Sequence, residues 1–304
     1  MTNLVHDQKT ISSKPAWLKV GLPRGEKYNW IKDKSGTLQL STVCQEARCP
    51  NIGECWQGGT ATFMLMGDIC TRGCRFCSVK TSRNPPDLDS NEPQKLADTI
   101  SQMNLNYVVI TSVDRDDLPD QGAEHIATSI RAVKSRNPDL LVEMLIPDFS
   151  GISSHIQKVI DAKPDVLAHN LETVDRLTSV VRDPRAGYQQ SIDVLLYIKK
   201  QNPRLYTKSS LMLGLGEARD EVITAMEQLY HCGVNFLTLG QYLQPNSTKL
   251  RVFRFIHPDE FRDLEEIGRK IGFDYVASGP LVRSSYRAAE FFIERKISLK
   301  TKAI

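Results

Sequence analysis

The sequence lacks long hydrophobic runs: none of its apolar stretches approaches the ~20 residues that a membrane-spanning helix needs. Its N-terminal stretch contains no apolar core behind a basic segment, and it lacks the Arg and Ser bias of an organelle transit peptide. A Walker-type loop, a Ser/His/Asp arrangement, an internal repeat and histidines at metal-binding spacing are also absent. These absences predict a cytoplasmic protein without a membrane partner.

A large excess of one charge is absent as well. The 304 residues include 39 Lys and Arg against 36 Asp and Glu, and the net charge of +3 is too small to predict nucleic-acid binding. Basic residues are dense in the N-terminal arm, from Lys14 to Lys34, and near the other end, from Arg295 to Lys302. Solvated surface charge is the simpler interpretation, and an acidic protein partner is the alternative.

Cysteine is scarce but clustered, since six of the seven cysteines lie between Cys44 and Cys77. Three of them form a C-x3-C-x2-C run from Cys70 to Cys77, with Phe76 before the last. Closed structural metal sites use four protein ligands, whereas sites that perform chemistry leave one position open. Three thiolates on a [4Fe–4S] cluster leave one iron free for a small molecule. The alternatives are a zinc knuckle with a distant fourth ligand, or three unrelated buried cysteines.

A second trio, Cys44, Cys49 and Cys55, has the spacing C-x4-C-x5-C. It suits a second cluster that would carry electrons, hold substrate or supply atoms. Zinc binding by this trio and a disulfide framework of all six cysteines are the alternatives, and the absence of a secretory signal disfavours disulfides. Cys232 stands before Gly233 at the expected end of a helix, so we expect it to be a packed structural thiol.

Short apolar runs alternate with amphipathic stretches through most of the chain. Expected strands are 61–66, 107–113, 140–146, 166–170, 208–213 and 236–240, and expected helices are 94–103, 123–135, 152–162, 189–200 and 221–231. This alternation predicts right-handed βαβ units, a parallel sheet and an α/β fold: a partial (β/α)6 TIM-type barrel. We expect an N-terminal extension (1–59) with the auxiliary cysteines, the barrel (60–255) and a C-terminal extension (256–304). Active sites in such barrels lie at the carboxyl ends of the strands, where the Cys70 run falls.

The run from Cys70 to Cys77, with its aromatic residue, closely resembles the cluster motif of the radical S-adenosylmethionine (SAM) superfamily, which implies the same barrel. The two trios together resemble the lipoyl synthase family. Further matching segments, between roughly residues 35 and 290, are 49–56 (Cys-Pro-Asn-x-x-Glu-Cys-Trp), 60–64, 111–117, 169–173, 208–217 and 283–288 (Arg-Ser-Ser-Tyr-Arg-Ala).

The resemblance implies two [4Fe–4S] clusters. One would be held by Cys70, Cys74 and Cys77, and the other by Cys44, Cys49, Cys55 and Ser285, the second serine of the Arg-Ser-Ser-Tyr motif. A serine alkoxide is a hard ligand that holds iron less firmly than a thiolate, which suits a cluster that comes apart. From the residues alone, a helix N-cap competes as the role of Ser284 and Ser285.

Six further residues are candidates for binding SAM or substrate: Thr111, Asn170, Glu172, Arg182, Lys208 and Gly214. A glycine at position 214 would let the backbone approach a ligand closely, although an ordinary turn is the alternative. Asn170 and Glu172 would bind SAM or its ribose, and capping the helix that begins near Val174 is their alternative role.

The activity implied by the resemblance is radical SAM-dependent sulfur transfer. The open iron of the first cluster would chelate SAM, and one electron would release a 5′-deoxyadenosyl radical. Two sulfur atoms would enter at C6 and C8 of an octanoyl-lysine on a lipoyl carrier domain of a 2-oxo acid dehydrogenase or the glycine cleavage H protein. The auxiliary cluster would donate the sulfur, and a ferredoxin or flavodoxin would donate electrons. The rival hypotheses are a radical SAM enzyme whose second cluster survives turnover, and an iron–sulfur carrier that binds no SAM.

Overall fold

The computed structural model describes residues 14–19, 29, 41–42, 49, 51–53, 62–103, 105 and 107–285. The predicted cluster ligands Cys44 and Cys55 lie outside these residues, whereas Cys49 and Ser285 lie within them.

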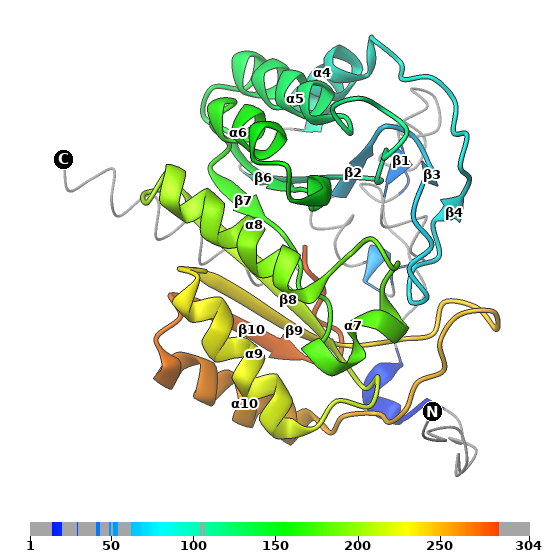
Figure 1. Ribbon diagram of the computed structural model, residues 1–304, viewed down its shortest axis with the longest axis vertical. Helices are drawn as coiled ribbons and strands as arrows, with labels where there is room; N and C mark the ends of the chain where they lie inside the picture. Colours follow the sequence, from blue (N-terminus) through cyan, green and yellow to red (C-terminus); the bar gives the residue numbers. More distant parts are fainter. Residues whose placement is uncertain are drawn as a thin grey trace.

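An eight-stranded curved sheet organises the described part of the chain (Figure 1). In spatial order its strands are β1 (Ser41–Thr42), β2 (Thr62–Leu65), β5 (Tyr107–Ser112), β6 (Leu141–Leu145), β7 (Val166–Ala168), β8 (Tyr206–Leu213), β9 (Phe236–Gln241) and β10 (Tyr275–Gly279). Only β1 runs antiparallel to its neighbour; each of the other pairs is parallel. All six predicted strands are therefore confirmed, together with their parallel order.

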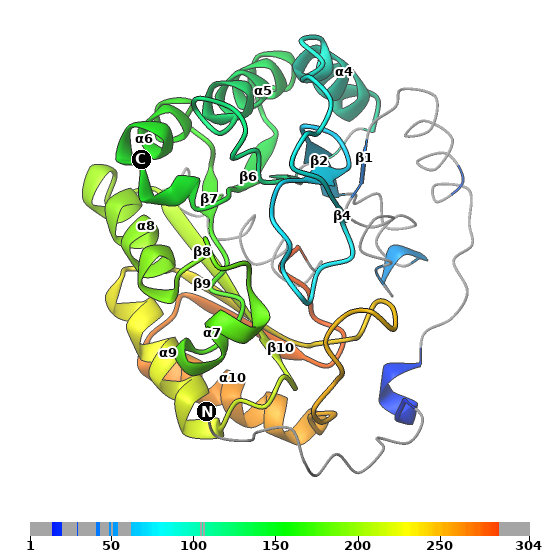
Figure 2. The same ribbon diagram turned by 45° about the vertical axis from the view of Figure 1, so that its right-hand side comes forward.

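Helices alternate with these strands and lie in an arc outside the sheet (Figure 2). They are α4 (Glu92–Met103), α5 (Ala123–Arg136), α6 (Ser153–Asp161), α7 (Asp175–Val181), α8 (Tyr188–Gln201), α9 (Arg219–His231) and α10 (Pro258–Ile271), with the 3-10 turns η1 (Ala16–Leu18) and η2 (Phe149–Gly151). The five predicted helices are confirmed, and so is the α/β fold of a partial TIM-type barrel. None of the described helices is long and apolar enough to span a membrane.

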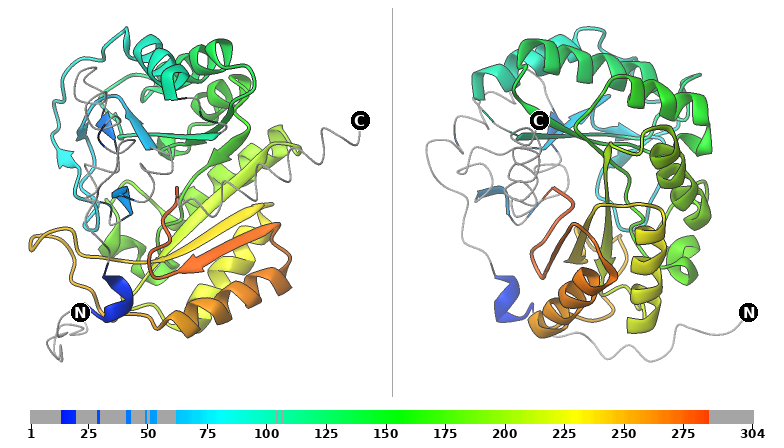
Figure 3. Two further views of the ribbon diagram at one scale, coloured as in Figure 1. Left: turned by 180° about the vertical axis from the view of Figure 1, so that it is seen from behind. Right: turned by 90° about the vertical axis from the view of Figure 1, so that its left-hand side faces the viewer.

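The sheet has two strands beyond the six that the sequence predicted, β1 at one edge and β10 at the other. After β9 the chain forms α10 and returns as β10, which pairs with β9 in register from Tyr275 opposite Phe236 to Gly279 opposite Gly240. Figure 3 shows β10, in orange-red, beside the yellow β9. This extra βαβ unit carries the chain from Gly279 to Ser285 at the carboxyl ends of the strands.

The barrel interior is filled at its other end. Tyr107, Val166, Tyr206 and Phe236 each begin a strand, and their side chains pack together, with Tyr206 stacked on Phe236. Space for a ligand therefore remains at the carboxyl ends of the strands, as the fold predicts.

Candidate functional site

A cavity of about 530 Å³ lies at the carboxyl ends of the strands. Its lining includes nine of the predicted site residues: Cys49, Cys70, Cys74, Cys77, Thr111, Asn170, Glu172, Arg182 and Ser285. Apolar side chains from the strands, such as Met64, Val109, Leu145 and Met212, line it as well. One cavity thus joins the first cysteine trio to a member of the second trio and to the serine motif.

The three cysteines of the first trio stand on a loop that leaves β2. The turn begins at Met66, which has a left-handed φ of 67° and whose backbone N–H donates to Glu92 at 2.9 Å. The loop closes where β3 (Ile69–Cys70) pairs with β4 (Lys80–Thr81), so residues 70–81 form a ring with fixed ends. In Figure 2 this segment lies inside the arc of helices, between β2 and β4.

Burial and backbone hydrogen bonds act in opposite directions on the thiols of this loop. Burial raises the pKa of Cys70 and of Cys74 to about 12 and raises that of Cys77 as well. Backbone N–H groups of Arg72 and Asp183 donate to the sulfurs of Cys70 and Cys74, each at 3.4 Å, and would stabilise thiolates. Metal binding replaces the thiol proton, and three soft donors suit iron and sulfide.

Among the described residues, no group of three His, Cys, Asp or Glu side chains could hold a single metal ion. A cubane does not require this convergence, because each thiolate binds a different iron atom. Three half-buried thiols, none of them in a disulfide, around one cavity therefore fit a [4Fe–4S] cluster.

The N-terminal arm and the end of the described chain meet at the cavity. The side chain of Asn51 donates to the carbonyl of Leu281 at 2.6 Å, across 230 residues of sequence. Burial lowers the pKa of Arg283, whose guanidinium lies against the Cys49 thiol and donates to the Gln241 carbonyl at 2.8 Å. The structure thus brings the middle cysteine of the second trio to the Arg-Ser-Ser motif.

A second group of polar residues lines the cavity near Cys74. Burial raises the pKa of Glu172, whose carboxylate accepts from the Asn170 amide at 3.1 Å. Arg182 is only 7% exposed; one of its terminal nitrogens donates to Ser191 at 2.7 Å. Its Nε has no partner within the described residues. This site therefore offers a buried cation with an unused donor to an anionic ligand.

Two candidates lie elsewhere. Lys208 is near the start of β8, inside the barrel, where its ammonium binds both carboxylate oxygens of Glu143 at 2.8 and 2.9 Å. Gly214 has a left-handed φ of 97°, and a Cβ there would overlap the Gln241 side chain and the Arg254 carbonyl. Neither residue lines the cavity, and Gly214 permits a close approach of protein to protein.

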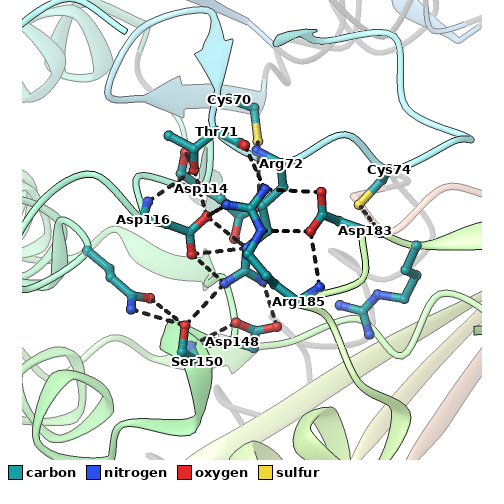
Figure 4. Close-up of polar contacts among 12 residues, drawn as sticks. Cys70, Thr71, Arg72, Cys74, Asp114, Asp116, Asp148, Ser150, Asp183 and Arg185 are labelled. Carbon is teal, nitrogen blue, oxygen red and sulfur yellow. Dashed lines mark hydrogen bonds and ion pairs between the residues drawn. The ribbon is translucent and has the colours of Figure 1, made fainter. Parts of the chain in front are cut away.

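The sequence analysis did not identify the charged residues that hold the loop of residues 70–81, called the cluster loop from here on (Figure 4). Arg72 is 3% exposed and binds Asp116 and Asp148, which follow β5 and β6. Burial raises the pKa of the neighbouring Asp114 to about 6, and Arg72 opposes this effect. The acid-rich segment 111–117 was a signal for such a role, but its arginine partner lies about 44 residues away.

Comparisons with known proteins identify the family and the fold. The family model of the radical SAM superfamily matches residues 64–229, more than half of the chain, and that of the N-terminal domain of lipoyl synthase matches residues 1–49. Solved structures similar to this one include a HydG maturase of the [FeFe]-hydrogenase (TM-score 0.57, 13% identity, 71% of this chain and 50% of that chain). Methylornithine synthase is another (TM-score 0.53, 12% identity, 81% of each chain). A partial barrel with the three-cysteine loop defines this protein as a radical SAM enzyme.

The particular family follows from closer relatives. The chain is 55% identical to a lipoyl synthase of Anaeromyxobacter sp. over 94% of its length and 97% of the relative's. It is also 55% identical to the mitochondrial lipoyl synthase of Homo sapiens over 95% of its length and 79% of the relative's. The chain therefore belongs to the lipoyl synthase family. Membership implies SAM and iron–sulfur clusters as cofactors and an octanoylated lipoyl domain as substrate.

Proposed function

We propose that this enzyme inserts two sulfur atoms, at C6 and C8, into a protein-bound octanoyl-lysine. Cys70, Cys74 and Cys77 would hold the cluster that binds SAM. A second cluster, held by Cys44, Cys49, Cys55 and Ser285, would be consumed as the sulfur donor. The observation that supports this proposal is the single cavity lined by the first trio, Cys49 and Ser285 together.

When bound, the clusters and SAM supply the primary carbon radical and the sulfur that unactivated C–H bonds require. The protein positions the reactants and excludes water. Met64, Val109, Leu145 and Met212 line the cavity with apolar surface that suits an alkyl chain. A hydrocarbon held against these side chains presents its C–H bonds without competing solvent.

Arg182 is the residue that we assign to the carboxylate of SAM, because its guanidinium is buried at the cavity and retains an unpaired donor. Asn170 and Glu172 lie beside it and would bind the SAM amino group or ribose. Thr111 lines the same cavity from β5. This assignment leaves Lys208 and Gly214 out of the SAM site.

Each of the three predicted segments of the chain would have its own role in the reaction. The extension 1–59 would carry three ligands of the auxiliary cluster, the barrel 60–255 would hold SAM, and the extension 256–304 would supply Ser285. The substrate would be a lipoyl domain of a 2-oxo acid dehydrogenase or the glycine cleavage H protein. A ferredoxin or flavodoxin in the cytoplasm would supply electrons.

The test is anaerobic reconstitution of the clusters, followed by incubation with SAM, a low-potential reductant and an octanoyl-lysyl peptide. Mass spectrometry would follow the peptide and 5′-deoxyadenosine together. A two-sulfur product with about two deoxyadenosines per peptide supports the proposal, since one radical is needed for each C–H bond. Deoxyadenosine without sulfur transfer would point to another substrate, and absence of SAM cleavage by the cluster-replete protein would contradict the proposal.

Three alanine variants assign the cysteines. Cys77→Ala should abolish deoxyadenosine formation, whereas Cys49→Ala should still form deoxyadenosine but yield no sulfur product. Cys232→Ala is the matched control, because this thiol is 5% exposed at the end of α9 and packs in the outer core. It should retain both products.

A further inference from the structure

Arg72 is one of the three residues between the first two cysteines of the cluster loop, yet its side chain points away from solvent. Its Nε and Nη2 donate to both oxygens of Asp116 at 2.7–3.1 Å, and its Nη1 donates to Asp148 at 2.8 Å. Asp148 is itself fully buried. A single guanidinium therefore connects the loop to two strand ends, after β5 and after β6.

The residues on either side of Arg72 are also held by hydrogen bonds to Asp116, Asp183 and Arg185. The Thr71 hydroxyl donates to Asp116 at 2.7 Å, and the Gly73 backbone N–H donates to Asp183 at 2.7 Å. Arg185 binds Asp183 at 2.8 Å and donates to the Thr71 carbonyl, also at 2.8 Å. Figure 4 shows these side chains around the backbone between Cys70 and Cys74.

We propose that Arg72 is a positioning residue that fixes the spacing of the Cys70, Cys74 and Cys77 thiols before any cluster binds. The inference rests on the proposed function only in that these cysteines hold the cluster. Each bond described above joins two groups of the protein, so none of them requires a cluster. The backbone N–H of Arg72 also donates to the Cys70 sulfur, so the orientation of this peptide and that of the guanidinium are linked.

The chemistry of the site requires arginine rather than any cation. The planar guanidinium binds one carboxylate through two of its nitrogens and donates to a second carboxylate from the third nitrogen. A lysine supplies a point charge on a flexible stem and cannot hold Asp116 and Asp148 in this geometry. Lysine at position 72 would therefore keep the positive charge but would not hold Asp116 and Asp148 in their present positions.

Arg115 provides a matched control for a purely structural effect. It is equally buried, at 2% exposure of its side chain, and its guanidinium binds Asp117 at 2.8 Å through two nitrogens. Within the described residues its side chain bonds to Asp117 and not to the cluster loop. Arg115→Lys thus removes a two-nitrogen contact of a buried arginine to one carboxylate, whereas Arg72→Lys also removes the bond to the fully buried Asp148.

The first measurement uses the cluster-free full-length protein. Amide hydrogen exchange, followed by mass spectrometry, reports the opening of peptides that cover residues 66–80. Arg72→Lys and Asp148→Asn should accelerate exchange in these peptides by at least tenfold, whereas Arg115→Lys should leave their rates unchanged. Equal acceleration in both arginine variants, or none in Arg72→Lys, would overturn the inference.

The second measurement uses the same variants with Cys49→Ala, so that only the first cluster contributes. Iron loss to a chelator should be faster by about 10- to 100-fold in Arg72→Lys, the usual cost when a group supporting a metal ligand is changed. The change in the electron paramagnetic resonance spectrum on addition of SAM should also weaken, and Arg115→Lys should match the parent. A parent that binds no cluster would overturn the proposed function as well, whereas a cluster equally stable in all variants would overturn only the role of Arg72.

Discussion

The buried ion pair between Lys208 and Glu143 allows a quantitative test of the barrel interior. The two side chains are 2% and 1% exposed, and the hydroxyl of Tyr107 donates to the same carboxylate. Replacing Lys208 with Met would leave the carboxylate buried without its cation. Breaking such a pair by removing one partner costs about 3–5 kcal/mol, a large part of the roughly 5–15 kcal/mol by which most domains are stable.

The assay is denaturant unfolding of the cluster-free protein, followed by circular dichroism, for Lys208→Met and for the double variant Glu143→Gln/Lys208→Met. The double variant should recover most of the loss, because a neutral amide is less costly to bury than a carboxylate and still accepts from Tyr107. SAM binding by the folded single variant should be unchanged, since Lys208 does not line the cavity.

Two results would contradict this role of the Lys208–Glu143 pair. A loss below about 1 kcal/mol in Lys208→Met would mean that the pair is not desolvated as the structure shows. A stable Lys208→Met protein that no longer binds SAM would mean that this lysine reaches the cavity, as expected from the sequence.

Three other perturbations follow from the site. Gly240→Ala should destabilise the protein by about 1–3 kcal/mol in the same unfolding assay, because a Cβ there would overlap the Val282 carbonyl. If this variant were as stable as the wild type, the segment before Ser285 would have to lie elsewhere. Burial lowers the pKa of His169 to about 4 from an ordinary value of 6.5, so the unfolded chain binds more protons in this window. The free energy of unfolding should therefore fall by up to about 3 kcal/mol as the pH drops from 6.5 to 4. His169→Gln should make the free energy of unfolding less dependent on pH in this range. An unchanged pH dependence in this variant would contradict the role of His169. Arg182→Met should weaken SAM binding by roughly 10- to 100-fold in equilibrium dialysis, the effect of removing a charged hydrogen bond, and unchanged binding would assign the carboxylate to another residue.

Much of the fold could be predicted because hydrophobic periodicity reports burial directly. The strands near 107–113 and 236–240 are apolar on both faces, and the structure places them in a sheet covered by helices. Strand β10 was not among the predicted strands, because its pairing with β9 depends on the return of the chain after α10. Local pattern carries no information on such partners.

In the site, too, features set by neighbouring residues could be predicted, and contacts between residues far apart in sequence could not. The spacing of the cysteines is local, so it predicted the loop that lines the cavity. The position of Lys208 at the filled end of the barrel depends on Glu143, which lies 65 residues earlier. The role of Arg72 depends on Asp148, 76 residues later, and cysteine spacing contains no sign of it. Residues whose partners are distant in sequence are therefore the ones that the structure adds.

The proposed role of the auxiliary cluster as sulfur donor can be tested by the origin of the sulfur atoms in the product. The protein would be reconstituted with ³⁴S-sulfide, freed of unbound sulfide and allowed a single turnover with an octanoyl-lysyl peptide. If the auxiliary cluster is the donor, the product contains two heavy sulfur atoms, and Cys49→Ala reconstituted in the same way forms no such product. A product that contains sulfur of natural isotopic composition would contradict it.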